Sequence, residues 1–253
     1  MNYKIRPLFL GSKEGDKSDS LYLYPQGEKY TACYCCYLVE GEDAKYLVDA
    51  GLPEPSYIQD KPFAKLKDAV SLREALLKAG AYPEQIQAII LTHLHYDHSF
   101  NLAMFPQARV YVQRRELAYA LTPLPCERRI YSLLKECGRP GWLDGVDRFE
   151  ILDGDAQIVP GIRAILTPGH SPGSQSIAVD TAAGTYILTG DCIPIYDNFE
   201  KCIPNTIHNN LFEWYASCDK LRACACALLP GHDMRVFDHA VYGEVDFQDK
   251  RTL

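Results

Sequence analysis

Four side chains that could bind a metal lie together in one short segment. Residues 92–98 read Thr-His-Leu-His-Tyr-Asp-His, so His93, His95, Asp97 and His98 follow directly after an apolar run. Neutral imidazole and carboxylate are ligands that zinc and similar divalent ions prefer. An ordinary solvated loop has no need for this density of ligand types, so the segment predicts a metal site.

The spacing of these ligands favours two metals over one. In an extended segment His93 and His95 point to the same side, whereas the adjacent Asp97 and His98 diverge unless the loop turns sharply. The helical zinc motif, two histidines four residues apart with a glutamate between them, does not occur here. We therefore expect this loop to supply ligands to two neighbouring metals.

Three further candidate ligands occupy similar places later in the chain. His170 lies in Thr-Pro-Gly-His, Asp191 in Leu-Thr-Gly-Asp and His232 in Leu-Pro-Gly-His. Each follows an apolar run and a glycine, which is typical of a strand or helix end that opens into a tight loop. With the first segment they offer five imidazoles and two carboxylates, enough for two metal sites.

The order of these seven residues resembles the metallo-β-lactamase superfamily, whose dinuclear members carry His-x-His-x-Asp-His, then an isolated His, an Asp and a final His. The resemblance spans about Cys33 to Asp233. It implies two bound divalent ions, zinc first, with iron, manganese or cobalt as alternatives. The implied ligands are His93, His95 and His170 for one metal, Asp97, His98 and His232 for the other, and Asp191 as the bridge.

Within that superfamily, residues 190–200 resemble the N-acyl-homoserine lactonase branch, which carries out quorum quenching. The resemblance implies a hydrolase in which a metal-bridging hydroxide opens a lactone ring. Asp191 would set the metal spacing, Asp97 would move a proton, and Tyr196 would donate a hydrogen bond to the developing oxyanion. The alternative for Tyr196 is a packed aromatic side chain. The chain departs from the branch at Ser174 and at Ser99-Phe100-Asn101, which leaves the substrate open.

Other activities of the same superfamily remain alternatives. The metal pair dictates hydrolysis but not the acyl group, so another ester, lactone or thioester hydrolase is the nearest alternative. A glyoxalase-II-like thioesterase is less favoured, because little sequence follows His232 to form the helical substrate domain of that branch. A non-hydrolytic diiron oxidoreductase is disfavoured further, since its altered first ligand cluster and flavin domain are not evident.

Charge and hydropathy restrict the partners. The 253 residues carry a formal net charge of -7, and the basic residues are scattered apart from pairs such as Arg128-Arg129. A nuclease would show a basic stripe, so we expect a small-molecule lactone or ester substrate and no nucleic-acid partner. No apolar run approaches the roughly 20 residues that span a bilayer, and Met1 to Gly11 lacks a signal layout. We expect a cytoplasmic enzyme without a membrane partner; a homodimer stays open.

The pattern of apolar residues alternates between strands and helices, which indicates an α/β fold. Ser71-Leu72-Arg73-Glu74 predicts a helix start with a capping box, and Gly80 predicts its end. The family resemblance sharpens the fold to an αββα sandwich of two mixed β-sheets flanked by helices. Strands are predicted at Ile5–Leu10, Ala32–Val39, Tyr46–Val48, Ala88–Leu91, Arg109–Val112, Ile162–Leu166, Ser176–Val179 and Tyr186–Leu188.

We expect one domain over residues 1–253, because every candidate ligand is needed in one site. Residues 121–147 fit none of the sandwich strands and are either an insertion over the active site or an ordinary helical excursion. The chain has ten cysteines, which we expect to be reduced. Those at 33–36 fall in a predicted buried strand, and Cys224 and Cys226 fall in a helical-looking stretch, Leu211–Leu228. We expect His208 and His239 not to be ligands.

Overall fold

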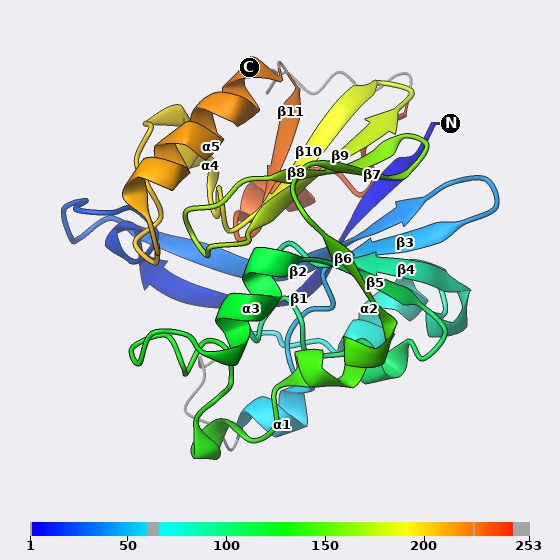
Figure 1. Ribbon diagram of the computed structural model, residues 1–253. Coiled ribbons are helices and arrows are strands. Elements are labelled where there is room, and N and C mark those ends of the chain that lie inside the picture. Colours follow the sequence, from blue (N-terminus) through cyan, green and yellow to red (C-terminus); the bar gives the residue numbers. More distant parts are fainter. Residues whose placement is uncertain (1, 60–65, 225, 245–253) are drawn as a thin grey trace.

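The computed structural model describes residues 2–59, 66–224 and 226–244. Two β-sheets pack face to face, and helices cover their outer faces, so the layers run helix, sheet, sheet, helix (Figure 1). This is the predicted αββα sandwich. In the described residues no helix is both long and apolar enough to cross a membrane.

The two sheets divide the chain into an N-terminal and a C-terminal half. The first has the order β1-β2-β3-β4-β5-β6 and the second β11-β10-β9-β8-β7. The strands of the first are β1 (Lys4–Asp16), β2 (Lys29–Glu40), β3 (Lys45–Val48), β4 (Ile86–Ile90), β5 (Arg109–Gln113) and β6 (Phe149–Leu152). Those of the second are β7 (Ala156–Val159), β8 (Ile162–Leu166), β9 (Gln175–Thr181), β10 (Gly184–Gly190) and β11 (Ala227–Pro230).

The helices are short and connect the strands. The α-helices are α1 (Pro55–Gln59), α2 (Leu72–Lys78), α3 (Arg114–Leu121), α4 (Tyr196–Glu200) and α5 (Leu211–Ala223). Short 3-10 helices lie at Lys17–Asp19, Pro83–Gln85, Leu102–Met104, Lys135–Cys137, Gly141–Arg148 and Met234–Phe237. The predicted capping box is confirmed, since the Ser71 hydroxyl accepts from the Glu74 amide and the Glu74 carboxylate accepts from the Ser71 amide.

Alternation along the strands assigns side chains to different layers. In β2, Cys33, Cys35 and Tyr37 face the second sheet, whereas Cys36 and Leu38 face the helices that cover the first. Successive strand residues point to opposite faces, and burial on both faces explains why β2 is apolar throughout its second half. A separate apolar cluster, centred on Trp214, fixes α5 to the second sheet.

All eight predicted strands exist, but three others were not predicted. β6 and β7 are four-residue strands with no fully buried side chain, so they lack a clear apolar pattern. The third, β11, corrects the helical prediction for Leu211–Leu228: α5 ends at Ala223 and Ala227–Pro230 pairs in parallel with β10. Ala225, inside that predicted helix, lies outside the described residues. Pairing with a distant strand overrode the local helical pattern.

Residues 121–147 contain turns and 3-10 helices rather than strands. Two of its hydrogen bonds tie this segment to the residues near the candidate ligands. The Tyr131 hydroxyl donates to Glu116 of α3 at 3.0 Å, and the amide of Tyr96 donates to the carbonyl of Ile130 at 2.9 Å. The segment therefore touches the loop that carries the first four candidate ligands.

Candidate metal centre

All seven candidate ligands lie just beyond the carboxyl ends of strands. The His93–His98 loop follows β4, His170 follows β8, Asp191 follows β10 and His232 follows β11. β9 runs antiparallel to both β8 and β10, and β11 is parallel to β10, so β8, β10 and β11 all end at one edge of the second sheet. Sheet topology thereby gathers residues that are far apart in the sequence.

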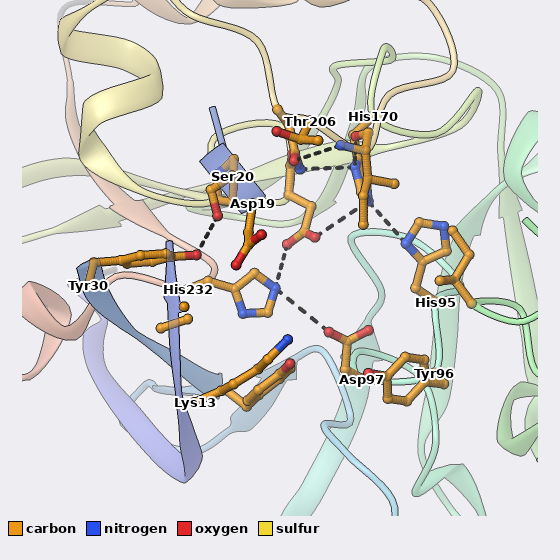
Figure 2. A pocket seen from close by; sticks show the side chains of 18 of the residues that line it. Lys13, Asp19, Ser20, Tyr30, His95, Tyr96, Asp97, His170, Thr206 and His232 are labelled. Atoms are coloured by element: carbon orange, nitrogen blue, oxygen red, sulfur yellow. Dashed lines mark hydrogen bonds and ion pairs between the residues drawn. The ribbon is translucent and has the colours of Figure 1, made fainter. Parts of the chain in front are cut away.

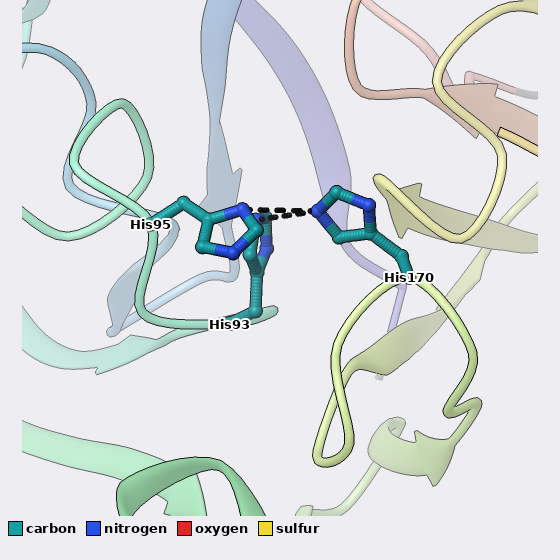
Figure 3. A group of neighbouring side chains, drawn as sticks. All are labelled: His93, His95 and His170. Atoms are coloured by element: carbon teal, nitrogen blue, oxygen red, sulfur yellow. Dashed lines mark hydrogen bonds between the residues drawn. The ribbon is translucent and has the colours of Figure 1, made fainter. Parts of the chain in front are cut away.

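Three imidazoles converge at one side of the centre (Figure 3). Nε2 of His170 lies 3.3 Å from Nε2 of His93 and 3.0 Å from Nδ1 of His95. All three residues are buried, and the three nitrogens fit within the span of one coordination sphere. This trio is the set expected for the first metal.

A second set meets at the other side. Nε2 of His98 and Nε2 of His232 lie 3.8 Å and 3.7 Å from Oδ2 of Asp97. Asp191 lies between the two sets: its Oδ2 is 3.4 Å from His170, and its Oδ1 is 3.3 Å from His98 and 3.0 Å from His232. A carboxylate whose two oxygens face different sets has the geometry of a bridge.

Hydrogen bonds on the far side of three imidazoles orient them. Nδ1 of His170 donates to the Ile207 carbonyl at 2.7 Å, and Nδ1 of His232 to the Cys33 carbonyl at 2.8 Å. Nδ1 of His98 lies 2.7 Å from a carboxylate oxygen of Asp49. Because each acceptor takes the Nδ1 proton, the neutral ring directs its Nε2 lone pair at the centre.

These donors fit divalent metal ions. Nε2 of His98 and Oδ1 of Asp191 are buried and have no hydrogen-bond partner in the described part of the chain, a costly arrangement without a cation. Burial, reinforced by the neighbouring imidazoles, lowers the pKa of His93 and His95, so both are in the neutral form that binds metal. Burial opposes a proton on His232, but Asp191 outweighs it and raises the His232 pKa to about 9.

A cavity of about 580 Å³ opens onto this centre. Figure 2 shows Asp97, His170 and His232 among the side chains that line it, together with Lys13, Asp19 and Tyr30. β1 and β2 supply one wall, because the alternate residues Tyr30, Ala32 and Tyr34 of β2 all line the cavity. Arg129 and Ile130 of the 121–147 segment line it as well.

Sequence comparison agrees with this geometry. The model of the metallo-beta-lactamase superfamily matches residues 35–232, which include all seven candidate ligands. The chain belongs to the metallo-β-lactamase superfamily. It is 33% identical over 180 residues to an N-acyl homoserine lactonase from Bacillus thuringiensis, covering 67% of each chain. It is 32% identical over 165 residues to the N-acyl homoserine lactonase AttM of Azorhizobium caulinodans, covering 61% of this chain and 60% of that one.

Solved structures from the superfamily share the whole fold. An N-acyl homoserine lactone hydrolase with the product N-hexanoyl-L-homoserine bound at its catalytic metal centre superposes with a TM-score of 0.77 at 28% identity. The match covers 94% of this chain and 96% of that one. A quorum-quenching N-acyl homoserine lactone lactonase gives a TM-score of 0.76 at 29% identity, covering 93% and 94%.

Asp49 is a buried residue of the site that the sequence analysis missed. Beyond its contact with His98, its carboxylate accepts from the backbone amide of Thr92 at 2.7 Å and from the Thr92 hydroxyl at 2.9 Å. It therefore positions both ends of the first ligand loop. Asp49 follows the apolar run of β3 and precedes Gly51 by two residues, a signal close to the one that singled out Asp191.

Glu116 of α3 is the second missed residue. It is fully buried, and its two oxygens accept four hydrogen bonds. The donors come from both ligand loops and the 121–147 segment: the Leu94 amide, the Tyr131 hydroxyl, the Ser171 hydroxyl and the Gly173 amide. Glu116 thus couples the loop of His93 and His95 to the loop of His170, and no local sequence signal marks it.

The structure does not bring the hydroxyl of Tyr196 to the cavity. That hydroxyl donates to the backbone carbonyl of Leu228 at 3.1 Å, and the ring packs in the core between the sheets. The described residues that line the cavity include Pro194 but not Tyr196. His208 also lies off the cavity, with its ring against Tyr22 and its Nδ1 2.9 Å from the Asn205 carbonyl.

Proposed function

We propose that this protein is a dinuclear-metal lactonase that hydrolyses N-acyl homoserine lactones. The observation that carries the proposal is the pair of ligand sets joined by Asp191 at the base of an open cavity. Relatives named N-acyl homoserine lactonase align over two thirds of the chain, and a product-bound lactone hydrolase shares the fold. These likenesses support the reaction; the residue roles rest on geometry.

The first ion would be held by His93, His95 and His170, and the second by Asp97, His98 and His232, with Asp191 between them. Imidazole and carboxylate ligands suit zinc best, and iron, manganese or cobalt are accepted by the same set. When bound, such ions make hydroxide available from water near neutral pH and polarise a carbonyl as Lewis acids. No serine or cysteine nucleophile is required.

Asp97 is placed to move the proton. Its side chain keeps 13% of its surface exposed and lines the cavity, whereas His98 beside it is 1% exposed. We assign Asp97 to take the proton of the attacking water and return it to the ring oxygen. Hydroxide adds to the carbonyl carbon, the ring carbon–oxygen bond breaks, and the oxygen leaves with that proton as a free hydroxyl. The product is a hydroxy acid.

We propose that the chain is a single domain built around this site and that residues 121–147 are an insertion over it. Arg129 and Ile130 line the cavity, and the contact from Tyr96 to Ile130 ties the insertion to the ligand loop. Such a segment can differ in sequence without disturbing the metals. The cytoplasmic location and the homodimer stay predictions, to be checked by fractionation and by light scattering.

The test is a substrate panel with metal content measured on the same sample. Ring opening releases a proton, so a weakly buffered indicator assay reports it directly. We expect turnover of N-acyl homoserine lactones by the metal-loaded protein, no turnover after chelation, and negligible cleavage of β-lactams or nucleic acids. Turnover of thioesters without turnover of any lactone would replace this proposal with the thioesterase alternative.

A further inference from the structure

The buried position of Tyr196 leaves a question about the oxyanion donor. Phenols do line the cavity, but they come from other parts of the chain: Tyr30 and Tyr34 from β2, and Tyr96 from the first ligand loop. A phenol is protonated at neutral pH, since its ordinary pKa is about 10. Each of the three could donate a hydrogen bond to a substrate, and their surroundings differ.

Tyr34 is the phenol tied most directly to the metal centre. Its ring stands edge-on to the ring of His232, with centroids 5.3 Å apart and planes at 76°. The preceding residue, Cys33, accepts the Nδ1 proton of His232 through its carbonyl and donates its amide to the His232 carbonyl. The same strand therefore carries Tyr34 and orients the ring of His232, which places the Tyr34 ring against a candidate ligand.

Tyr34 also faces the side of the centre where Asp97 lies. The side chains of Tyr34 and Tyr96 are close enough to influence each other's pKa, and Tyr96 directly precedes Asp97. Burial and then the charge of Asp97 raise the pKa of Tyr34. A substrate that reaches Asp97 and His232 through the cavity passes this phenol.

Tyr30 and Tyr96 are less suited to the role. The Tyr30 hydroxyl lies 2.5 Å from the Ser20 hydroxyl, on the far side of the cavity from Asp97 and Tyr96 (Figure 2). Tyr96 lines the cavity too, but its side chain is more deeply buried than that of Tyr34, and its backbone is held by the 121–147 segment. Tyr34 is left as the phenol beside both Asp97 and His232.

We propose that Tyr34 is a catalytic residue that donates a hydrogen bond to the substrate oxygen that gains negative charge as the ester bond is attacked, with Tyr96 as its positioning residue. This inference rests on the proposed lactonase function. The phenol keeps its proton throughout; the proton that reaches the leaving oxygen comes from the attacking water through Asp97. The role is the one that the sequence resemblance implied for Tyr196.

The experiment compares Tyr34→Phe with Tyr37→Phe in the metal-loaded enzyme. Tyr37 lies on the same strand, but its hydroxyl donates to the Pro230 carbonyl in the core at 2.6 Å. Losing one oxyanion donor costs roughly a hundredfold in turnover. We expect Tyr34→Phe to lower kcat about a hundredfold with KM changed less, at full metal content and unchanged melting temperature. We expect Tyr37→Phe to lower the melting temperature and leave kcat within a few fold.

A second readout separates donation from packing. Calorimetry with the ring-opened N-acyl homoserine should show weaker binding to Tyr34→Phe, because the product oxygens lose the same donor. Tyr96→Phe should give a smaller loss of kcat than Tyr34→Phe. Unchanged kcat and unchanged product affinity in Tyr34→Phe would overturn the proposal while leaving the lactonase function intact. A wild-type enzyme that turns over no lactone or ester at full metal content would instead overturn the function and this inference with it.

Discussion

The metal centre and the wall of the cavity above it are built in different ways. At the centre, His98 and His170 are buried and His232 is largely buried, and each is bonded on its far side to a fixed acceptor, as His98 is to Asp49. On the wall, Lys13, Asp19 and Arg129 are exposed, and the Tyr30 hydroxyl bonds to the hydroxyl of Ser20. The centre therefore sets the class of reaction, whereas the wall is free to select the substrate. The predictions below test that division.

Lowering the pH should weaken metal binding at the centre. Because the His232 pKa is raised to about 9 by Asp191, the metal-free folded protein carries a proton there at neutral pH, and metal must displace it. Metal affinity should therefore increase as the pH is raised towards about 9. Below that pH the association constant should change by about tenfold per pH unit for each proton that the metal displaces. Competition titrations with a zinc indicator at several pH values measure this slope. Affinity independent of pH between 6.5 and 9 would contradict the picture of the centre.

Removing the charge of Asp49, which is not itself a candidate ligand, should weaken metal binding. Asp49→Asn suits the positive backbone φ of 67° at this position, so it removes the charge without straining the backbone, and its amide nitrogen replaces one of the two oxygens that accept from Thr92 and His98. We expect metal affinity to drop roughly 10- to 100-fold, the usual cost of losing a partner that orients a ligand. Asp43→Asn, on the exposed turn before β3, is the control and should bind metal normally. Equal metal affinities of the two variants would show that Asp49 does not orient a metal ligand.

Glu116→Gln tests the hydrogen bonds through which Glu116 joins the two ligand loops. An amide in place of this carboxylate turns one acceptor into a donor that faces other buried donors, so we expect a loss of about 2–3 kcal/mol of unfolding free energy. Glu150→Gln removes an exposed ion pair with Arg109 and should cost less than about 1 kcal/mol. Urea unfolding of the metal-free proteins measures both. If Glu116→Gln lost no more unfolding free energy than Glu150→Gln, the Glu116 carboxylate would not be needed to hold the two ligand loops together.

Tyr196→Phe should give the smallest effect on catalysis. Its hydroxyl is bonded in the core, so the variant should lose about 1 kcal/mol of stability and keep kcat within a few fold at full metal occupancy. Steady-state kinetics and thermal unfolding on the same sample decide between packing and catalysis. A hundredfold loss of kcat with unchanged stability would restore the catalytic role that the sequence resemblance implied.

The seven candidate ligands that the structure brings together could be singled out in the sequence because their signals are local. His93 to His98 are consecutive, and His170, Asp191 and His232 each follow an apolar run and a glycine. The partners that support them were missed because they are distant in sequence. Asp49 lies 43 residues from Thr92 and 49 from His98, and Glu116 lies 57 residues from Gly173.

The wall was predicted poorly for a related reason. The strand prediction for β1 stopped at Leu10, because the polar residues that follow hide the extension to Asp16. That extension pairs Lys13 with Ala32 and Gly15 with Tyr30, which places the wall. Tyr196 was chosen by its distance from Asp191 along the chain, but the direction of its side chain depends on the packing of α4 against the core. Spacing alone does not contain that information.

Metal content per chain tests the account most directly. The purified protein, stripped and then reloaded with zinc, should contain two ions per chain by elemental analysis, and N-acyl homoserine lactone turnover should rise with occupancy. His93→Ala and His232→Ala should each lower the number, because each removes a nitrogen from a different set. At most one ion per chain in the wild-type protein under saturating zinc would contradict the dinuclear centre.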